Sequence, residues 1–178
     1  MLVRLTAAVL VAVVALIALT GPAGAATITQ VHSQVGDENW NDKNDSDPTD
    51  FWSDGLAAAA GNDYVVPSGF TVRTVLTTST SFNGDSITVE AGGRLGIRGP
   101  DGGTHTANFI LDGDTGNGIN AFWPGTQHLA GSLAVTANGG VLDLDRTGRN
   151  MVIDVGVTGG AGATLNVVQQ AQPNSGAS

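Results

Sequence analysis

The chain has 178 residues, a net charge of −9 at pH 7, 26 glycines and no cysteine. Without thiols it forms neither disulfides nor thiolate metal sites, so packing and backbone hydrogen bonds must stabilise it. The acidic balance disfavours nucleic acid and anionic membrane surfaces as partners. It favours cations and neutral or basic partners.

Residues 1–25 have the pattern of a cleavable export signal. Arg4 precedes an apolar stretch over residues 5–19, and the small residues Ala23 and Ala25 follow. This pattern predicts cleavage by a signal peptidase after Ala25. A membrane anchor would need about 20 apolar residues, which is more than this stretch supplies. We therefore expect the mature chain to be secreted, extracellular or at the cell surface, without membrane contact after cleavage.

Residues 26–63 are predicted to form a loop-rich N-terminal cap. Half of the acidic residues, 8 of 16, lie between Asp37 and Asp63. They alternate with Asn, Ser, Pro and Gly, which are turn formers. We expect Trp40 and Trp52 to plug the first coil of a repeat fold, and the alternative is that they stack on sugar rings.

Residues 64–168 are predicted to be all β. Short runs of Val, Ile, Leu, Phe and Thr each end at Gly, Asn or Asp, and several alternate with a period of two, as Ile87 and Val89 do. The predicted strands are 64–66, 70–76, 86–90, 94–98, 107–111, 133–137, 141–145, 151–155 and 164–168. Residues 169–178 are polar and are predicted to be a disordered tail.

The predicted strands also resemble one another. Residues 87–95 and 133–142 both have the order strand, Gly-Gly turn, strand, and they lie 46 residues apart. Residues 109–113 fall about halfway between them. A period of roughly 20–25 residues fits one coil of a β-solenoid. We therefore predict a parallel β-solenoid over 64–168, and the alternative is a β-sandwich.

Several segments carry a resemblance to a known family. They are FWSDGL at 51–56, AGNDYVV at 60–66, FNGDSITV at 82–89, ANFILDG at 107–113 and GRNMVID at 148–154. The chain resembles the N-terminal region of secreted bacterial proteins with autotransporter-associated β-strand repeats. VTGGAGATL at 157–165 resembles a first, degenerate copy of the repeat.

The resemblance implies a right-handed β-helix passenger with a structural or adhesive role at the cell surface or beyond. Family members are usually far longer, and they carry an outer-membrane barrel or a sorting tail that we do not recognise in this sequence. We therefore expect either a short stand-alone form or the first segment of a longer passenger.

The acidic loop raises the question of calcium. Residues 42–46 have the alternating oxygen ligands that open an EF-hand loop, but Asp47 and Ser53 stand where that loop needs Gly and Glu. The sequence therefore excludes an EF-hand. A weak, irregular calcium site stays open beside the alternative of a solvated loop. Its ligands would be Asp42, Asp45, Asp47 and Asp50.

Paired carboxylates raise the question of catalysis. Asp143 and Asp145 are two residues apart on a predicted strand, which places both on its solvent side. Glycoside cleavage needs two carboxylates at a set separation across a bond, and the sequence shows no such groove. We expect no enzyme, and a polysaccharide lyase or hydrolase is the least favoured reading.

The favoured function is a non-enzymatic, exported scaffold with a structural or adhesive role. The alternative is an extracellular polysaccharide-binding module, in which Trp123 and Phe122 stack on sugar rings. We expect no cofactor other than the open calcium site. The expected partners are polysaccharide or other surface proteins, together with end-to-end self-association, because the column of strands shows no C-terminal cap.

Overall fold

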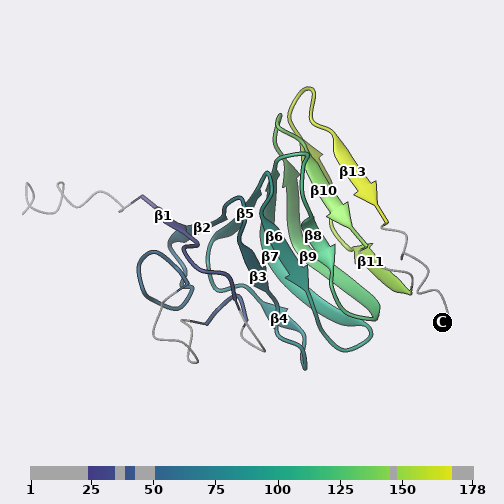
Figure 1. Cartoon of the computed structure of the whole chain (residues 1–178), viewed down its shortest axis with the longest axis horizontal. Helices are drawn as coiled ribbons and strands as arrows, with labels where there is room; N and C mark the ends of the chain where they lie inside the picture. The colour runs from purple at the N-terminus through teal and green to yellow at the C-terminus, as the bar shows by residue number, and fades with distance from the viewer. Residues whose placement is uncertain (1–23, 35–38, 43–50, 145–147, 170–178) are drawn as a thin grey trace, which may run out of the picture.

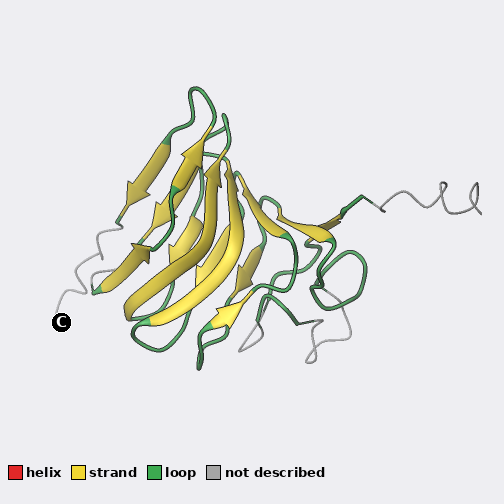
Figure 2. Ribbon diagram, turned by 180° about the vertical axis from the view of Figure 1, so that it is seen from behind, coloured by secondary structure: helices red, strands yellow, loops and turns green. Residues whose placement is uncertain are grey.

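The computed structural model describes residues 24–34, 39–42, 51–144 and 148–169. These residues form β-strands joined by turns and loops (Figure 2). The described part of the chain contains no helix that could cross a membrane.

The strands form two sheets. The first has the order β1 (Ala26–Thr29), β2 (Asn62–Val66), β5 (Ser86–Glu90), β7 (Gly103–Asp112), β9 (Gly125–Val135) and β11 (Arg149–Ile153), with β4 (Thr80–Ser81) on β7 and β12 (Val157–Gly159) on β9. The second has the order β13 (Leu165–Val168), β10 (Gly140–Asp143), β8 (Gly118–Ala121), β6 (Arg94–Ile97) and β3 (Thr71–Arg73).

Parallel pairing between successive coils generates a β-solenoid. In the first sheet Tyr64 pairs with Ile87, Ile87 with Phe109, and Phe109 with Leu133, which are steps of 23, 22 and 24 residues. The coils stack along the long axis of the molecule, from the purple to the yellow end of the chain (Figure 1). The predicted all-β solenoid and its period are therefore confirmed, and the sandwich alternative is wrong.

One pairing between the named strands departs from the parallel pattern. β8 and β10 are joined by a single antiparallel pair, Leu142 with Gly118. Gly118 has a φ of 50°, and a Cβ atom there would lie 2.1 Å from the carbonyl oxygen of Val141. A glycine is needed at this crossing because no side chain fits against that backbone.

The first sheet bends, so that each complete coil has three strand segments. β4 and β11 pair with the first halves of β7 and β9, whereas β5 and β12 pair with the second halves. Gly131 lies at the bend of β9 with a φ of 101°, and a Cβ atom there would be 2.2 Å from the carbonyl oxygen of Ala107. The bend turns the flat ladder into two faces of a column.

Aliphatic side chains stack inside the column in rows that follow the strand register. One row runs through Val66, Val89, Leu111 and Val135, all at most 5% exposed. Val72, Leu95 and Ile119 form the facing row of the second sheet and are fully buried. Each coil thus covers the apolar interior of the preceding coil.

The predicted strands differ from the observed ones mainly in length. β5 has the predicted bounds, β7 and β9 are longer than predicted, and the predicted strand 70–76 shrinks to Thr71–Arg73. Four strands were not predicted, namely β1, β4, β8 and β12. β8 consists of Gly, Ile, Asn and Ala, whose small and polar residues give no strand pattern, and the ladder of its neighbours imposes the extended conformation.

Candidate functional site

The two ends of the solenoid differ, and the N-terminal end is closed by aromatic side chains. Trp40, Phe51 and Trp52 are at most 1% exposed, and they pack with Tyr64 and Phe82. The ring centroids are 4.7 Å apart for Trp52 and Tyr64, and 5.3 Å apart for Trp40 and Phe82. Trp40 and Trp52 are therefore buried, as the predicted plug requires, and Trp40 also packs on His105 and Phe109 of β7.

Backbone hydrogen bonds also close the N-terminal edge of the first sheet. The segment around Trp52 runs antiparallel to β1 and forms a bridge to Gln30. The Ser53 N–H donates to the Thr29 carbonyl at 2.8 Å, and the Val31 N–H donates to the Phe51 carbonyl at 2.7 Å. A short strand-like segment of the cap therefore pairs with the C-terminal end of β1, at Thr29, and with the two residues that follow it.

The N-terminal edge of the second sheet is covered in the same way. The backbone N–H of Gln34 donates to the Thr71 carbonyl at 2.9 Å, and the side-chain amide of Gln30 donates to the same oxygen at 2.8 Å. The Gln34 side-chain oxygen accepts a hydrogen bond from the Arg73 N–H. Residues 30–34 thus satisfy the backbone groups of β3 that would otherwise face solvent.

The C-terminal end has no such cover among the described residues. β11 and β12 pair with β9, and β13 pairs with β10, and these strands have no partner on their outer side within the part of the chain that the structure describes. They lie together at the yellow end of the chain in Figure 1. They carry Val152, Val157, Val167 and Val168, which are 37%, 48%, 65% and 40% exposed.

This open edge has a definite chemistry. Unpaired N–H and C=O groups on a strand bind another strand by backbone hydrogen bonds, and the exposed valines add apolar area to such a contact. The seven exposed large hydrophobic residues in the described part of the chain include these four valines. The open edge, defined by β11, β12 and β13, is therefore the candidate functional surface.

The predicted sugar-stacking residues have different environments. Trp123 is 42% exposed. The Phe122 ring is half-buried, and the guanidinium carbons of Arg73, Arg94 and Arg149 lie 5.1, 4.7 and 5.8 Å from its centroid. The two residues therefore do not form one flat exposed strip. The repeat period places Arg73 and Arg94 on neighbouring predicted strands, but it gives no sign that Arg149 and Phe122 join them.

The predicted calcium ligands are described only in part. Asp42 accepts a hydrogen bond from the Asn39 N–H at 3.0 Å and closes a turn of the cap. Asp45, Asp47 and Asp50 lie outside the described residues. The described residues contain no group of three or more His, Asp or Glu side chains that could hold a metal ion. The calcium site stays a prediction.

The predicted carboxylate pair is not a pair of exposed acids. Asp143 is 1% exposed, so the prediction that it faces solvent is wrong, and Asp145 lies outside the described residues. Leu142 faces the core, so period-two alternation places Asp143 on the outer face of β10. Alternation does not show whether other residues cover that outer face. Asp112 accepts hydrogen bonds from Thr136 and from Asn138, one coil further on.

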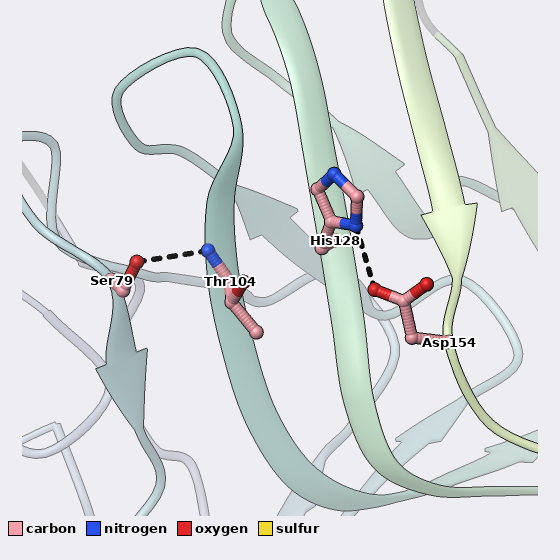
Figure 3. A network of polar contacts seen from close by, with 4 residues as sticks. All are labelled: Ser79, Thr104, His128 and Asp154. Carbon is pink, nitrogen blue, oxygen red and sulfur yellow. Dashed lines mark hydrogen bonds and ion pairs between the residues drawn. The ribbon is translucent and has the colours of Figure 1, made fainter.

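The histidines also take up positions that sequence spacing did not indicate. His128 Nδ1 lies 2.6 Å from a carboxylate oxygen of Asp154, which follows one coil later (Figure 3). Ser79 accepts a hydrogen bond from the Thr104 N–H at 2.9 Å, and the strand of Thr104 lies between Ser79 and His128 in Figure 3. These residues therefore do not form a Ser-His-Asp nucleophile relay. The one-coil separation of His128 and Asp154 is a signal that the repeat period could have supplied.

His105 is enclosed in the interior. It is fully buried, with Nδ1 3.1 Å from the Thr80 hydroxyl and Nε2 3.2 Å from the Gln127 side-chain oxygen. Burial lowers the pKa of His105 below 6.5, and the hydrogen bond to Gln127 opposes this shift. His105 is therefore a core residue with a polar partner at each ring nitrogen.

Comparisons of the chain with protein-family models, with curated proteins and with solved structures find no match to any of them.

Proposed function

We propose that this chain is a non-enzymatic structural module of an extracellular or cell-surface scaffold, and that the open edge is its assembly surface. The observation that carries the proposal is the difference between the two ends of the solenoid. The cap pairs with the C-terminal end of β1 and with β3 at the N-terminal sheet edges, whereas β11, β12 and β13 present unpaired outer sides within the described residues. Export of the module is supported by the signal pattern of residues 1–25.

The occupant of the open edge is proposed to be a second copy of the chain. An edge that exposes valines and unpaired backbone groups is complementary to itself under a twofold rotation, which is the commonest symmetry of homo-oligomers. The N-terminal end offers no matching ladder because Phe51 and Trp52 with residues 30–34 already occupy it. The contact therefore joins two C-terminal ends and closes at a dimer, rather than growing into a fibre.

Polar contacts on the outside of the solenoid support a structural role. Ser132 donates to Asn108 at 3.0 Å, and Asn108 donates to the carbonyl of Asp85 at 2.8 Å. These partners are 24 and 23 residues apart, so each bond links one coil to the next. His128 and Asp154 do the same in the last coils. These Ser, Asn, His and Asp side chains are of types that often serve in catalysis. Here they form hydrogen bonds between neighbouring coils.

The test compares two lysine variants in solution. Val157→Lys combined with Val167→Lys places two charges on the open edge, where a paired strand would bury them. Leu56→Lys is the matched control, since Leu56 is 61% exposed but belongs to the cap. We expect sedimentation equilibrium to give a concentration-dependent dimer for the wild-type chain and for Leu56→Lys. The double variant should stay monomeric with an unchanged circular dichroism spectrum.

Two results would overturn the proposal. A wild-type chain that sediments as a monomer up to its solubility limit has no assembly surface of this kind. A Leu56→Lys variant that dissociates as completely as the double variant would show that general charge, and not the open edge, controls association.

A further inference from the structure

Three guanidinium groups gather around one aromatic ring on the second sheet. The guanidinium carbons of Arg73, Arg94 and Arg149 all lie within 5.8 Å of the centroid of Phe122. Arg94 donates to the side-chain oxygen of Asn120 at 2.9 Å, and Arg149 donates to the Ala121 carbonyl at 3.1 Å. These contacts fix the positive groups in place around Phe122. We name this set the arginine cluster.

The position of the arginine cluster is unusual for a chain with a net charge of −9. The described residues contain four basic side chains, and Arg98, the fourth, directly follows β6 in the same sheet. Asp143 is the one acidic residue within the five strands of this sheet. Positive charge is therefore concentrated around Phe122, where Arg73 and Arg94 come from the second sheet and Arg149 comes from β11 of the first sheet. Within about 8 Å salt screens such charges only in part.

Arg73 and Asn120 each carry a buried donor without an acceptor. Arg73 Nε and Asn120 Nδ2 are buried and make no hydrogen bond within the described residues, and the whole Asn120 side chain is buried. Arg73 and Asn120 lie in one row across the sheet, separated by Gly96. A Cβ atom on Gly96 would be 3.3 Å from Arg73 Cγ and 3.6 Å from Phe122 Cβ, so those two side chains close over the glycine. Buried donors without acceptors are costly unless an anion or water satisfies them.

The guanidinium of Arg73 is the member best suited to bind a ligand. The structure gives it no hydrogen bond and no ion pair through its side chain within the described residues, and it is only partly buried. A guanidinium presents a planar fork that matches the two oxygens of a carboxylate. The Phe122 ring holds this fork by a cation–π contact at 5.1 Å.

Trp123 adds a second recognition element. It directly follows Phe122 in the chain, and 42% of its surface is exposed. An exposed indole offers an apolar face to the ring of a sugar. Arg73 contacts the Phe122 ring and Trp123 is the next residue in the chain, so a carboxylate-binding fork and an exposed indole are both tied to Phe122. This combination suits a sugar that carries a carboxylate.

We propose that the arginine cluster and Trp123 bind an acidic polysaccharide through the carboxylate of a uronic acid unit. This site goes beyond the proposed scaffold function and does not depend on it. It lies on β3, β6 and the segment that follows β8, and it shares with the open edge only Arg149, the first residue of β11. The rest of the chain is acidic and repels polyanions, so a polyanion is held only where the arginines gather.

The test is calorimetric titration of the full chain with an oligogalacturonate and with a neutral oligosaccharide of the same length. We expect binding of the oligogalacturonate alone. Arg73→Ala should weaken this binding by about ten-fold or more, because a charged hydrogen-bond partner of the carboxylate is lost. Arg73→Lys, which keeps the charge but not the fork, should fall between Arg73→Ala and wild type. Trp123→Ala should weaken binding without changing the melting temperature.

Lys43→Ala provides the matched control, because it removes the same charge at a position outside the described residues. It should bind the oligogalacturonate as the wild type does. Three outcomes overturn the proposal: no binding of the oligogalacturonate, an equal loss in Lys43→Ala and Arg73→Ala, or equally tight binding of polyglutamate, which would indicate a general polyanion or acidic peptide site. None of these outcomes bears on the sedimentation test of the open edge.

Discussion

The first and last coils of this solenoid are built from similar short strands, yet their outer sides differ. At the N-terminal end an antiparallel segment around Trp52 pairs with β1, and residues 30–34 pair with β3. At the C-terminal end β11, β12 and β13 have no outer partner among the described residues. A parallel repeat always leaves an edge at each end, and an edge is closed only by a segment that departs from the repeat.

The two ends also differ in how much their apolar side chains contribute to the free energy of folding. Apolar residues of the closed end, such as Phe51 and Trp52, are at most 1% exposed, whereas Val157 and Val167 are 48% and 65% exposed. Burial of apolar area supplies most of the free energy of folding. The closed end should therefore contribute strongly to the stability of the single chain, and the open end should contribute only after association.

The largest effect is expected from opening the closed end. Trp52→Ala removes a fully packed side chain that contacts Phe51 and Tyr64. The free energy of unfolding should fall by about 3–5 kcal/mol, since a cavity forms and the interior of the first coil meets water. Urea denaturation followed by circular dichroism measures this loss.

Trp123→Ala is the matched control for Trp52→Ala. Trp123 is 42% exposed, so its removal should change the free energy of unfolding by no more than about 0.5 kcal/mol. Equal losses in the two variants would contradict the assignment of Trp52 as the plug of the first coil.

A smaller loss of unfolding free energy is expected when valine is changed to alanine. The same change is made in the interior of the solenoid and at the open edge. Val89→Ala removes two methyl groups from a side chain that is 1% exposed, and it should cost about 2 kcal/mol. Val167→Ala removes the same groups from a side chain that is 65% exposed, and it should cost at most about 0.5 kcal/mol. Both are measured by urea denaturation at a protein concentration at which the chain is monomeric. A loss at Val167 as large as that at Val89 would show that the outer side of β13 is covered.

The repeat itself was predictable from the sequence because spacing encodes it. Ile87, Phe109 and Leu133 pair in register at the separations that the repeated motif indicated. Trp40 and Trp52 were also placed correctly, since large aromatics beside polar turns have few places to pack other than the open first coil.

The features that were not predictable depend on distant contacts. β8 has no strand pattern of its own, and the ladder that extends it comes from residues about one coil away. The burial of Asp143 and the gathering of three arginines on Phe122 depend on what covers the outer face of the second sheet. Alternation tells which side a residue faces, but it does not tell whether that side meets water.

The smallest expected change is a pH dependence confined to the closed end. His105 is buried against Trp40, with ring centroids 6.4 Å apart, and burial lowers the pKa of His105 below 6.5. Below pH 6.5 the unfolded chain binds a proton at His105 more readily than the folded chain does, so the free energy of unfolding must fall as the pH drops. His105→Gln cannot bind that proton, and its free energy of unfolding should fall less between pH 7 and pH 5 than that of the wild type. If His105→Gln lost stability between pH 7 and pH 5 as steeply as the wild type, the acid sensitivity would not come from His105.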